Sequence, residues 1–252
     1  MFTLPVSRLE VALRPPCGAD DLALVEGPRE ALPAAIAMLA RLARRLDGAA
    51  QDWAQLTVTD FEFLLLNLRG FLLGDDISSM AACAACGERV EISFGIAAYT
   101  AHVQPQLVAG VEAAREGWLV LGAARFRLPV MADVLEARTA RDPGETLRRR
   151  CLAPQLESRL QRRIEQVIEK LAPQASGEVG GACPSCGTAL ASWFDVPGFV
   201  MAELRRLAAG LYREVHLLAA HYHWAEAAIL ALPGARRRAY AGLILDASLA
   251  GG

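Results

Sequence analysis

The sequence has 252 residues, of which 54% are hydrophobic and 21% are charged, and this composition excludes a chain dominated by disorder. Its formal net charge of −2 excludes a globally basic nucleic-acid-binding protein, although not a local basic patch. The length favours one compact body or a core with an appendage.

The most apolar run of the sequence does not predict a membrane span. Residues 61–73 include Glu62, Asn67 and Arg69, whereas a spanning helix needs about 20 nearly uncharged residues. The N-terminus also lacks the basic start and apolar stretch of a signal peptide. We therefore expect a cytoplasmic protein without a membrane partner. In that compartment paired cysteines more often bind a metal than form disulfides.

The first third of the chain predicts a strand and two helices. Alternating apolar residues indicate a strand over 9–13, and apolar residues every three or four positions from Leu32 to Leu46 indicate a helix that ends near Gly48. Thr59 and Glu62 have the spacing of a capping box, so a second helix is expected to begin there and to stop at Gly74.

The middle of the chain predicts a hairpin followed by helices. Strand-like residues lie on both sides of Gly122, and Asp142 followed by Pro143 is typical of a helix start. The expected elements are strands at 118–121 and 125–128, helices at 133–138, from 142 onward and at 156–171, and a linker at 176–181.

The sequence repeats a cysteine motif at an interval of 100 residues. CAACGERVEISF begins at Cys83 and CPSCGTALASWFDV begins at Cys183. Each copy predicts a zinc knuckle that runs into a β-strand. The matched pairs are Cys83/Cys183, Cys86/Cys186, Gly87/Gly187, Val90/Leu190 and Phe94/Phe194.

This spacing suits a closed metal site. Two cysteines separated by two residues can turn both sulfurs toward one point, and the following glycine tolerates the positive φ of the tight turn. Two such knuckles complete a tetrahedral site that has no open coordination position. We predict one structural Zn²⁺ per chain, bound by Cys83, Cys86, Cys183 and Cys186. Residues 97–178 would be inserted between the knuckles.

Other roles for the cysteines and histidines are less favoured by the sequence. A thiol-redox CxxC requires a cysteine at a helix N-terminus, whereas both motifs run into strand-like sequence; degenerate sites or two knuckles in trans stay open. Cys17 and Cys151 have no partner at ligand spacing and are expected to be small core residues. The helical spacing of His216, His221 and His223 does not favour a second metal site.

Catalysis and nucleic-acid binding are not expected. The sequence contains no GxSxG, P-loop or GxGxxG motif, so we predict no enzyme. Arginine clusters at 148–150, 162–163 and 236–238 raise the question of nucleic acid, but aromatic residues are not interleaved with them. Solvated helix faces are the preferred interpretation, and a zinc-ribbon regulator that binds nucleic acid is the alternative function.

The last 55 residues predict a helical cap. A long helix is expected over 200–223, a short helix over 224–232, and a final helix after the Pro-Gly turn. The whole chain is thus predicted to be α+β and mostly α-helical, with a Cys₄ zinc ribbon split by a long insertion and followed by that cap. The expected segments are 1–50 (strand and amphipathic helix), 51–96 (helix and first knuckle), 97–178 (insert), 179–197 (second knuckle) and 198–252 (C-terminal helices).

The C-terminal segment also carries a resemblance to a known family. Its pattern is W-x-E-x-x-I-x-x-L-P-x-x-x-R-x-x-Y, and stretches such as FLLGDDI and FRLPVMADVLEA match the same layout. Over residues 53–245 the chain resembles the zinc-ribbon baseplate hub assembly proteins of contractile-tail phages, including T-even types, and of phage-derived contractile injection systems. The residues that meet the pattern are Trp224, Glu226, Ile229, Leu232, Pro233, Arg237 and Tyr240.

The resemblance implies a non-enzymatic, chaperone-like assembly factor or a structural component of a phage-like baseplate. It implies partners among the baseplate hub, spike or tube-initiator proteins, and a place in the cytoplasm or in the assembled particle. It carries over the four matched cysteines as the metal site. It also implies a partner-binding role for Trp224, Leu232, Pro233, Arg237 and Tyr240.

Overall fold

The computed structural model describes residues 1–154 and 156–250 and divides the chain into two compact units. The first unit comprises Met1–Val11 and Arg45–Val196, and the second comprises Ala12–Arg44 and Pro197–Gly252. Helices predominate in the described chain and the sheets are small and antiparallel, so the predicted α+β class is confirmed.

The core helix of the first unit is α3 (Val58–Leu73), which carries the predicted apolar run. It ends, as predicted, at Gly74, whose φ of 88° favours glycine. The predicted start was wrong: the cap is Thr57, whose side chain accepts a hydrogen bond from the backbone N–H of Asp60. Thr59 is instead buried inside the first turn.

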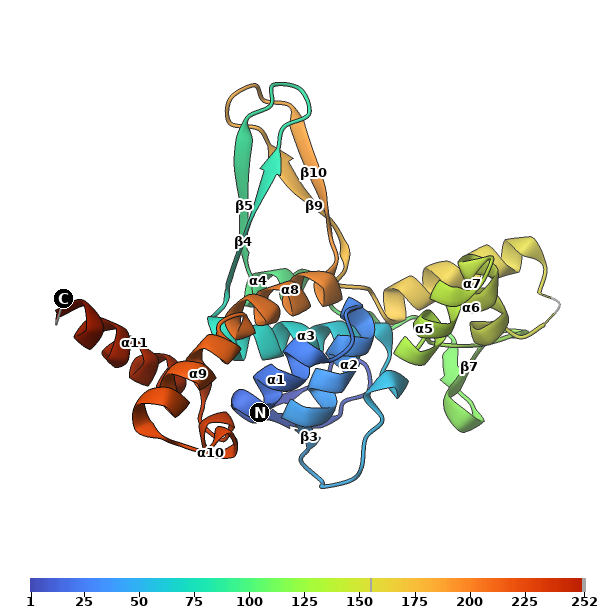
Figure 1. The fold of residues 1–252 in the computed structure, drawn as a ribbon. Coiled ribbons are helices and arrows are strands. Elements are labelled where there is room, and N and C mark those ends of the chain that lie inside the picture. The colour runs from blue at the N-terminus through green and yellow to red at the C-terminus, as the bar shows by residue number, and fades with distance from the viewer. Residues whose placement is uncertain (155, 251–252) are drawn as a thin grey trace. The chain divides into compact units, whose positions relative to one another are not determined.

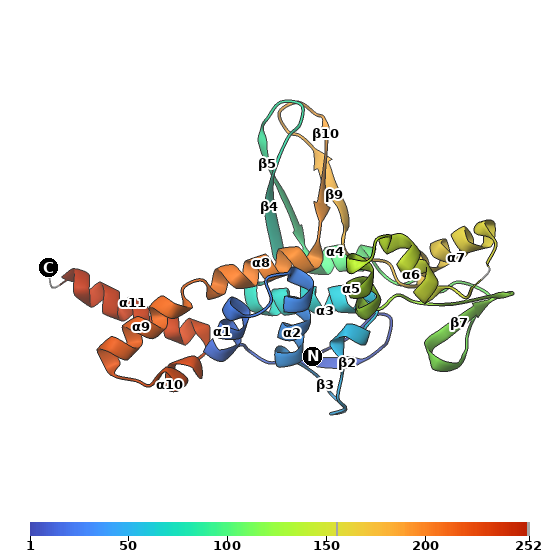
Figure 2. The same cartoon turned by 45° about the vertical axis from the view of Figure 1, so that its right-hand side comes forward.

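Two β-hairpins stand side by side in the first unit, with their loops together at the top of Figure 1 and of Figure 2. One pairs β4 (Asp76–Ala82) with β5 (Arg89–Gly95), and the other pairs β9 (Gly177–Ala182) with β10 (Ala189–Phe194). The linker predicted at 176–181 was therefore wrong, and β4 was not foreseen. Neither β4 nor β9 has the regular apolar alternation that predicts a strand. Both adopt extended backbone because they pair with the strand that follows them.

The segment between the hairpins contains strands and helices, and the last two residues of the predicted insert, 177 and 178, belong to β9 instead. A three-stranded sheet packs against α7, and Phe126 and Ile164 are fully buried between them. Asp142 caps α6 through the backbone N–H of Glu145, as its sequence predicts. The elements are α4 (Ile96–His102), β6 (Val111–Ala113), the 3₁₀ turn Arg115–Gly117, β7 (Trp118–Leu121), β8 (Ala124–Arg127), α5 (Met131–Thr139), α6 (Pro143–Cys151) and α7 (Ser158–Leu171).

Three short strands near the N-terminus form a sheet in the order β1 (Phe2–Thr3), β2 (Glu10–Leu13) and β3 (Ala43–Arg45). The strand predicted over 9–13 is confirmed by β2. The helix predicted to end near Gly48 ends at Leu42, earlier than expected, because the chain then becomes β3. A 3₁₀ turn, η1 (Trp53–Gln55), precedes α3.

The second unit is helical. Its elements are α1 (Gly18–Glu26), α2 (Ala31–Leu42), most of α8 (Val196–Ala208), α9 (Leu211–Tyr222), α10 (Glu226–Leu230) and α11 (Gly234–Ala250). The single helix predicted over 200–223 was wrong, since α8 and α9 are separated at Gly210.

The C-terminal segment packs on the preceding helix, α9. Leu218 of α9, Ile229 of α10 and Ile244 of α11 form one buried cluster, and Trp224 and Tyr240 pack against it. The two aromatic rings meet at 90° with their centroids 5.3 Å apart, an edge-to-face geometry that aromatic pairs favour. Among the described residues, no helix has both the length and the apolar character needed to cross a bilayer.

Candidate metal centre

The four cysteines of the repeat converge where the two hairpin loops meet. The sulfurs of Cys83, Cys86, Cys183 and Cys186 all lie within 4.8 Å of one another. The contacts cross between the hairpins: Sγ of Cys83 is 3.7 Å from Sγ of Cys186, and Sγ of Cys86 is 3.7 Å from Sγ of Cys183. These distances are far longer than a disulfide bond. The predicted ligands therefore form one cluster that could hold one metal ion.

The two cross-hairpin separations match those of a tetrahedral thiolate site. Zinc–sulfur bonds of about 2.3 Å place tetrahedral ligands about 3.8 Å apart, close to the cross-hairpin separations. Four sulfurs would fill such a coordination shell completely. A metal held here would supply cross-linking of the hairpins and no site for substrate.

The two loops that carry the sulfurs have the same backbone. The N–H of Cys83 donates to the carbonyl of Glu88 and that of Cys183 to the carbonyl of Thr188, each at 2.8 Å. The N–H groups of Gly87 and Gly187 donate to the first cysteine of their own loop, also at 2.8 Å. Both glycines have positive φ, 74° and 71°. The sequence repeat thus encodes a repeated knuckle.

Each knuckle has one sheltered and one exposed sulfur. Cys83 and Cys183 are each 2% exposed and pack with Leu190 and Val90, the aliphatic residues matched by the repeat. The second cysteine of each pair is exposed. The cluster therefore lies at the protein surface, with an apolar base on the side of Cys83 and Cys183.

The two exposed thiols of the cluster, Cys86 and Cys186, have shifted pKa values. The hydroxyl and backbone of Thr188 and the Cys86 thiol lower the pKa of Cys186 to about 6. Although a hydrogen bond with the backbone of Glu88 favours the Cys86 thiolate, neighbouring thiols, Cys186 first, raise the pKa of Cys86 to about 12. The pKa values of these two exposed thiols thus move in opposite directions, as expected of two neighbouring groups that titrate together.

The base of the arm formed by the two hairpins is fixed by aromatic rings. Phe94 and Phe194, which the repeat matches, meet edge to face at 5.3 Å, and Tyr99 lies 4.9 Å from Phe94 and 5.7 Å from Phe194. The Tyr99 hydroxyl donates to the carbonyl of Ala175, just before β9. The repeat therefore places packing partners at both ends of the hairpins.

Glu62 anchors the second hairpin from α3, a role that the sequence did not reveal. This carboxylate is 3% exposed. It accepts hydrogen bonds from the backbone N–H groups of Ala175 and Ser176 and from the Ser176 hydroxyl, at 2.6, 3.1 and 2.5 Å. The same hydroxyl accepts from the N–H of Val196 at 3.0 Å. Glu62 thus binds the start of the hairpin directly and its end through the Ser176 hydroxyl. Its only sequence trace is an acidic residue within an apolar run.

We expect Gly187→Ala to weaken metal binding while the body of the first unit stays folded. An added Cβ would meet no atom within 4 Å, so the cost comes from the positive φ alone, about 1–2 kcal/mol. Competition with a chromophoric chelator measures the affinity. Gly181→Ala is the matched control, because that glycine also has open space but lacks a positive φ. Equal affinities in both variants would contradict the expectation.

The remaining candidate residues lie elsewhere. Cys151 is buried, and desolvation raises the pKa of its thiol to about 11, consistent with the predicted core role. Cys17 is only half-buried and precedes α1, so its predicted place in the core was wrong. The metal-ligand cluster found in the described part of the chain contains cysteines and no histidine.

The arginine clusters differ in exposure. Arg162 and Arg163 are exposed, as expected of a solvated helix face. Arg237 is 1% exposed, so a solvated role was wrong for this residue. Its predicted partner-binding neighbours Trp224, Leu232 and Tyr240 are half-buried, and Pro233 is exposed.

Comparisons of the chain with protein-family profiles, with curated protein sequences and with solved structures found no match.

Proposed function

We propose that the protein is a non-enzymatic assembly factor or structural component of the baseplate of a phage-like contractile tail or injection system. The observation that carries this proposal is the pattern from Trp224 to Tyr240, which resembles that of the zinc-ribbon baseplate hub assembly proteins. In this chain the pattern spans a packed element, because Ile229 is buried and Trp224 and Tyr240 contact each other.

The metal in this proposal is a single structural Zn²⁺. Four cysteine sulfurs at tetrahedral spacing are the ligand set that structural zinc sites use. The site would cross-link two hairpins that are separated by the whole insert, and metal binding would contribute directly to the stability of the arm. Such an arm suits a scaffold that presents surfaces to other proteins.

The partners in the proposal are the hub, spike or tube-initiator proteins of the tail. The arm exposes two large apolar side chains, Met80 at 52% and Trp193 at 69%. Aromatic residues and methionine are enriched in protein interfaces. Both side chains are therefore the first candidates for contact with a baseplate protein.

Deletion of the gene tests the proposal. We expect sheath and tube proteins still to be made, while electron microscopy finds few complete particles. The full chain supplied in trans should restore the particles, and a tagged chain should capture a hub, spike or tube-initiator protein from producing cells. Normal particles with intact baseplates in the deletion strain would refute the proposal. Affinity for random DNA that falls steeply with salt would instead support a nucleic-acid-binding regulator.

A further inference from the structure

A second internal repeat, at an interval of 113 residues, lies outside the cysteine motifs. LRPPCGADDL begins at Leu13 and FRLPVMADVL begins at Phe126. Each copy contains the end of a short strand, a proline, and a helix that starts four residues after the arginine: α1 in the first copy and α5 in the second. The identical positions are Arg14/Arg127, Pro16/Pro129, Ala19/Ala132, Asp20/Asp133 and Leu22/Leu135.

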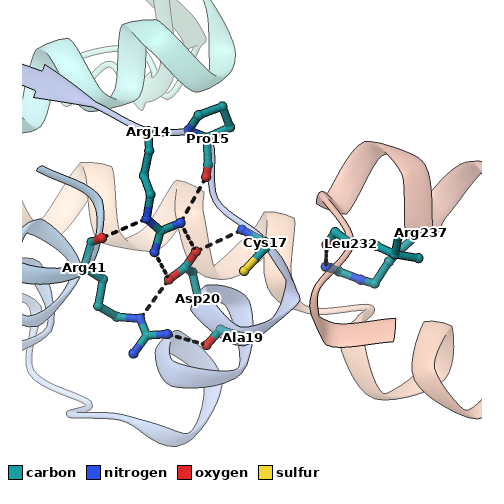
Figure 3. Close-up of polar contacts among 8 residues, drawn as sticks. All are labelled: Arg14, Pro15, Cys17, Ala19, Asp20, Arg41, Leu232 and Arg237. Atoms are coloured by element: carbon teal, nitrogen blue, oxygen red, sulfur yellow. Dashed lines mark hydrogen bonds and ion pairs between the residues drawn. The ribbon is translucent and has the colours of Figure 1, made fainter. Parts of the chain in front are cut away.

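The aspartate of the first copy is the centre of a hydrogen-bonded clasp (Figure 3). Asp20 is fully buried and accepts two hydrogen bonds from Arg14, at 2.7 and 2.8 Å, and one from Nε of Arg41 on α2, at 2.8 Å. The backbone N–H of Cys17 donates to it at 2.9 Å. Burial alone would raise the pKa of Asp20, but these donors hold it at about 2.

The aspartate of the second copy repeats this clasp. Asp133 is fully buried and accepts two hydrogen bonds from Arg127, both at 2.7 Å, and one from Nε of Arg150 on α6, at 2.5 Å. The backbone N–H of Val130 donates to it at 3.0 Å. In both copies the second arginine comes from the next helix, so the chain contains two versions of one two-helix module.

Each module also holds another segment of the chain in the same way. The first N–H of α1, from Gly18, donates to the carbonyl of Leu232 at 3.0 Å, and that of α5, from Met131, donates to the carbonyl of Leu56 at 3.0 Å. In each module, the residue just before the first helix forms an antiparallel pair with the residue that follows the bound leucine. These pairs are Cys17 with Pro233 and Val130 with Thr57.

The two held segments have a common form. In each, a short helix leads to the leucine, and a long helix begins two residues after it: α10 and α11 in one case, η1 and α3 in the other. The first module helix packs against the short helix in both, α1 on α10 and α5 on η1. Both modules therefore bind a leucine-bearing segment at the start of a helix.

The first module also binds an arginine of the held segment. Arg237 of α11 donates to Asp21 of α1 at 2.5 Å. It also donates to Glu214 of α9 at 3.0 Å and, within its own segment, to the carbonyl of Leu232 at 3.0 Å. A side chain at Gly18 would lie 2.7 Å from Nη1 of Arg237. The module thus fits a segment of the form Leu-Pro-x-x-x-Arg.

The segment held by the first module is much less deeply packed than its counterpart. Helix α3 is buried along most of its length. In the described part of α11 only Arg237, Ala241 and Ile244 are buried, and Leu243 is 60% exposed. The link from α9 to α10 passes through His223, whose left-handed φ of 57° is unfavourable for a residue other than glycine. Apart from Ile229 of α10, few side chains of this segment are buried, so it is the more readily released of the two.

We propose that the first module is a docking site for partner-protein segments of the form Leu-Pro-x-x-x-Arg at the start of a helix, and that residues 226–250 fill it as a releasable latch. A partner carrying such a segment would bind by displacing the latch. This inference rests on the two matching clasps and does not depend on the proposed baseplate role.

A labelled peptide with the sequence of residues 224–245 is the probe, titrated into the full chain and followed by fluorescence anisotropy. Arg237→Ala weakens the latch but leaves the site intact, so we expect this variant to bind the peptide at least about tenfold more tightly than the unmodified chain, whose site is filled. Arg238→Ala is the matched control, because Arg238 is exposed. A peptide with alanine in place of the arginine that selects the site should not bind.

A disulfide lock keeps the test decisive if Arg237→Ala misfolds. Cys17 and Pro233 are opposed in an antiparallel pair, a separation that suits a disulfide. In the Pro233→Cys variant we expect oxidation to abolish peptide binding and reduction to restore it. Peptide affinity that is equal in Arg237→Ala and Arg238→Ala, both folded, or that is unchanged by the lock, would overturn the proposal.

Discussion

Replacing Cys183 by serine is expected to abolish stoichiometric metal binding and to separate the two hairpin loops. The remaining sulfurs cannot close a tetrahedral shell, and Cys183 is also part of the apolar base below the cluster. Structural zinc contributes about 10–16 kcal/mol to the folding of zinc-finger peptides, so the loops should lose their order without it. Metal analysis of the purified protein should fall from about one zinc per chain to nearly none.

The effect should be confined to the arm. At its base Phe94, Phe194 and Tyr99 pack on one another, and α3 is buried along most of its length. Hydrogen exchange should therefore accelerate in β5 and β10 near the loops and stay slow in α3. Cys17→Ser is the control, since Cys17 lies outside the cluster. Full zinc content in Cys183→Ser, or equal zinc loss in the control, would contradict the assignment.

The sequence predicts the metal cluster well because its geometry is local and repeated. Two residues between cysteines and a glycine after them determine each knuckle, and the interval of 100 residues shows that the knuckles match. The strand after each knuckle was predictable for the same reason. The strands before the knuckles were not, since SSMAA and GEVGGA form strands only through their pairing with β5 and β10.

The burial of charged residues was also not predictable from the sequence. Arg237 stands in a run of three arginines, which ordinarily indicates a solvated face, and only contact with Asp21 and Glu214 makes it a core residue. The clasp around Asp20 depends on Arg41, which lies 21 residues further along the chain. Partners so far apart in the sequence produce no periodic pattern that would reveal them. The repeat at an interval of 113 residues is visible in the sequence, but its five identical residues are spread over a strand end, a loop and a helix start and so match no single predicted element.

Glu62 provides the second large expected effect, because it is the buried charge on which the second hairpin depends. Glu62→Ala would leave the N–H of the fully buried Ala175 and both donors of Ser176 without their acceptor. Buried donors without partners cost about 1–3 kcal/mol each, so we expect the free energy of unfolding to fall by about 3–5 kcal/mol. Urea denaturation measures this loss, and Glu178→Ala, an exposed site on β9, is the matched control.

The pH dependence of stability in the Glu62→Gln variant distinguishes the effect of the Glu62 charge from that of its hydrogen bonds. Desolvation raises the pKa of Glu62 above its usual value, against the donors of Ser176 and Ala175. A carboxyl whose pKa is higher in the folded than in the unfolded chain contributes stability that is complete below the unfolded value, about 4.5, and is lost as pH rises through the folded value. The glutamine does not titrate. The stability of the unmodified chain relative to Glu62→Gln should therefore be greater at pH 5 than at pH 7.5, in paired urea titrations where effects on the cysteines cancel. A difference that shrinks as pH falls would show that the carboxylate, once formed, is more stable in the folded protein than in water.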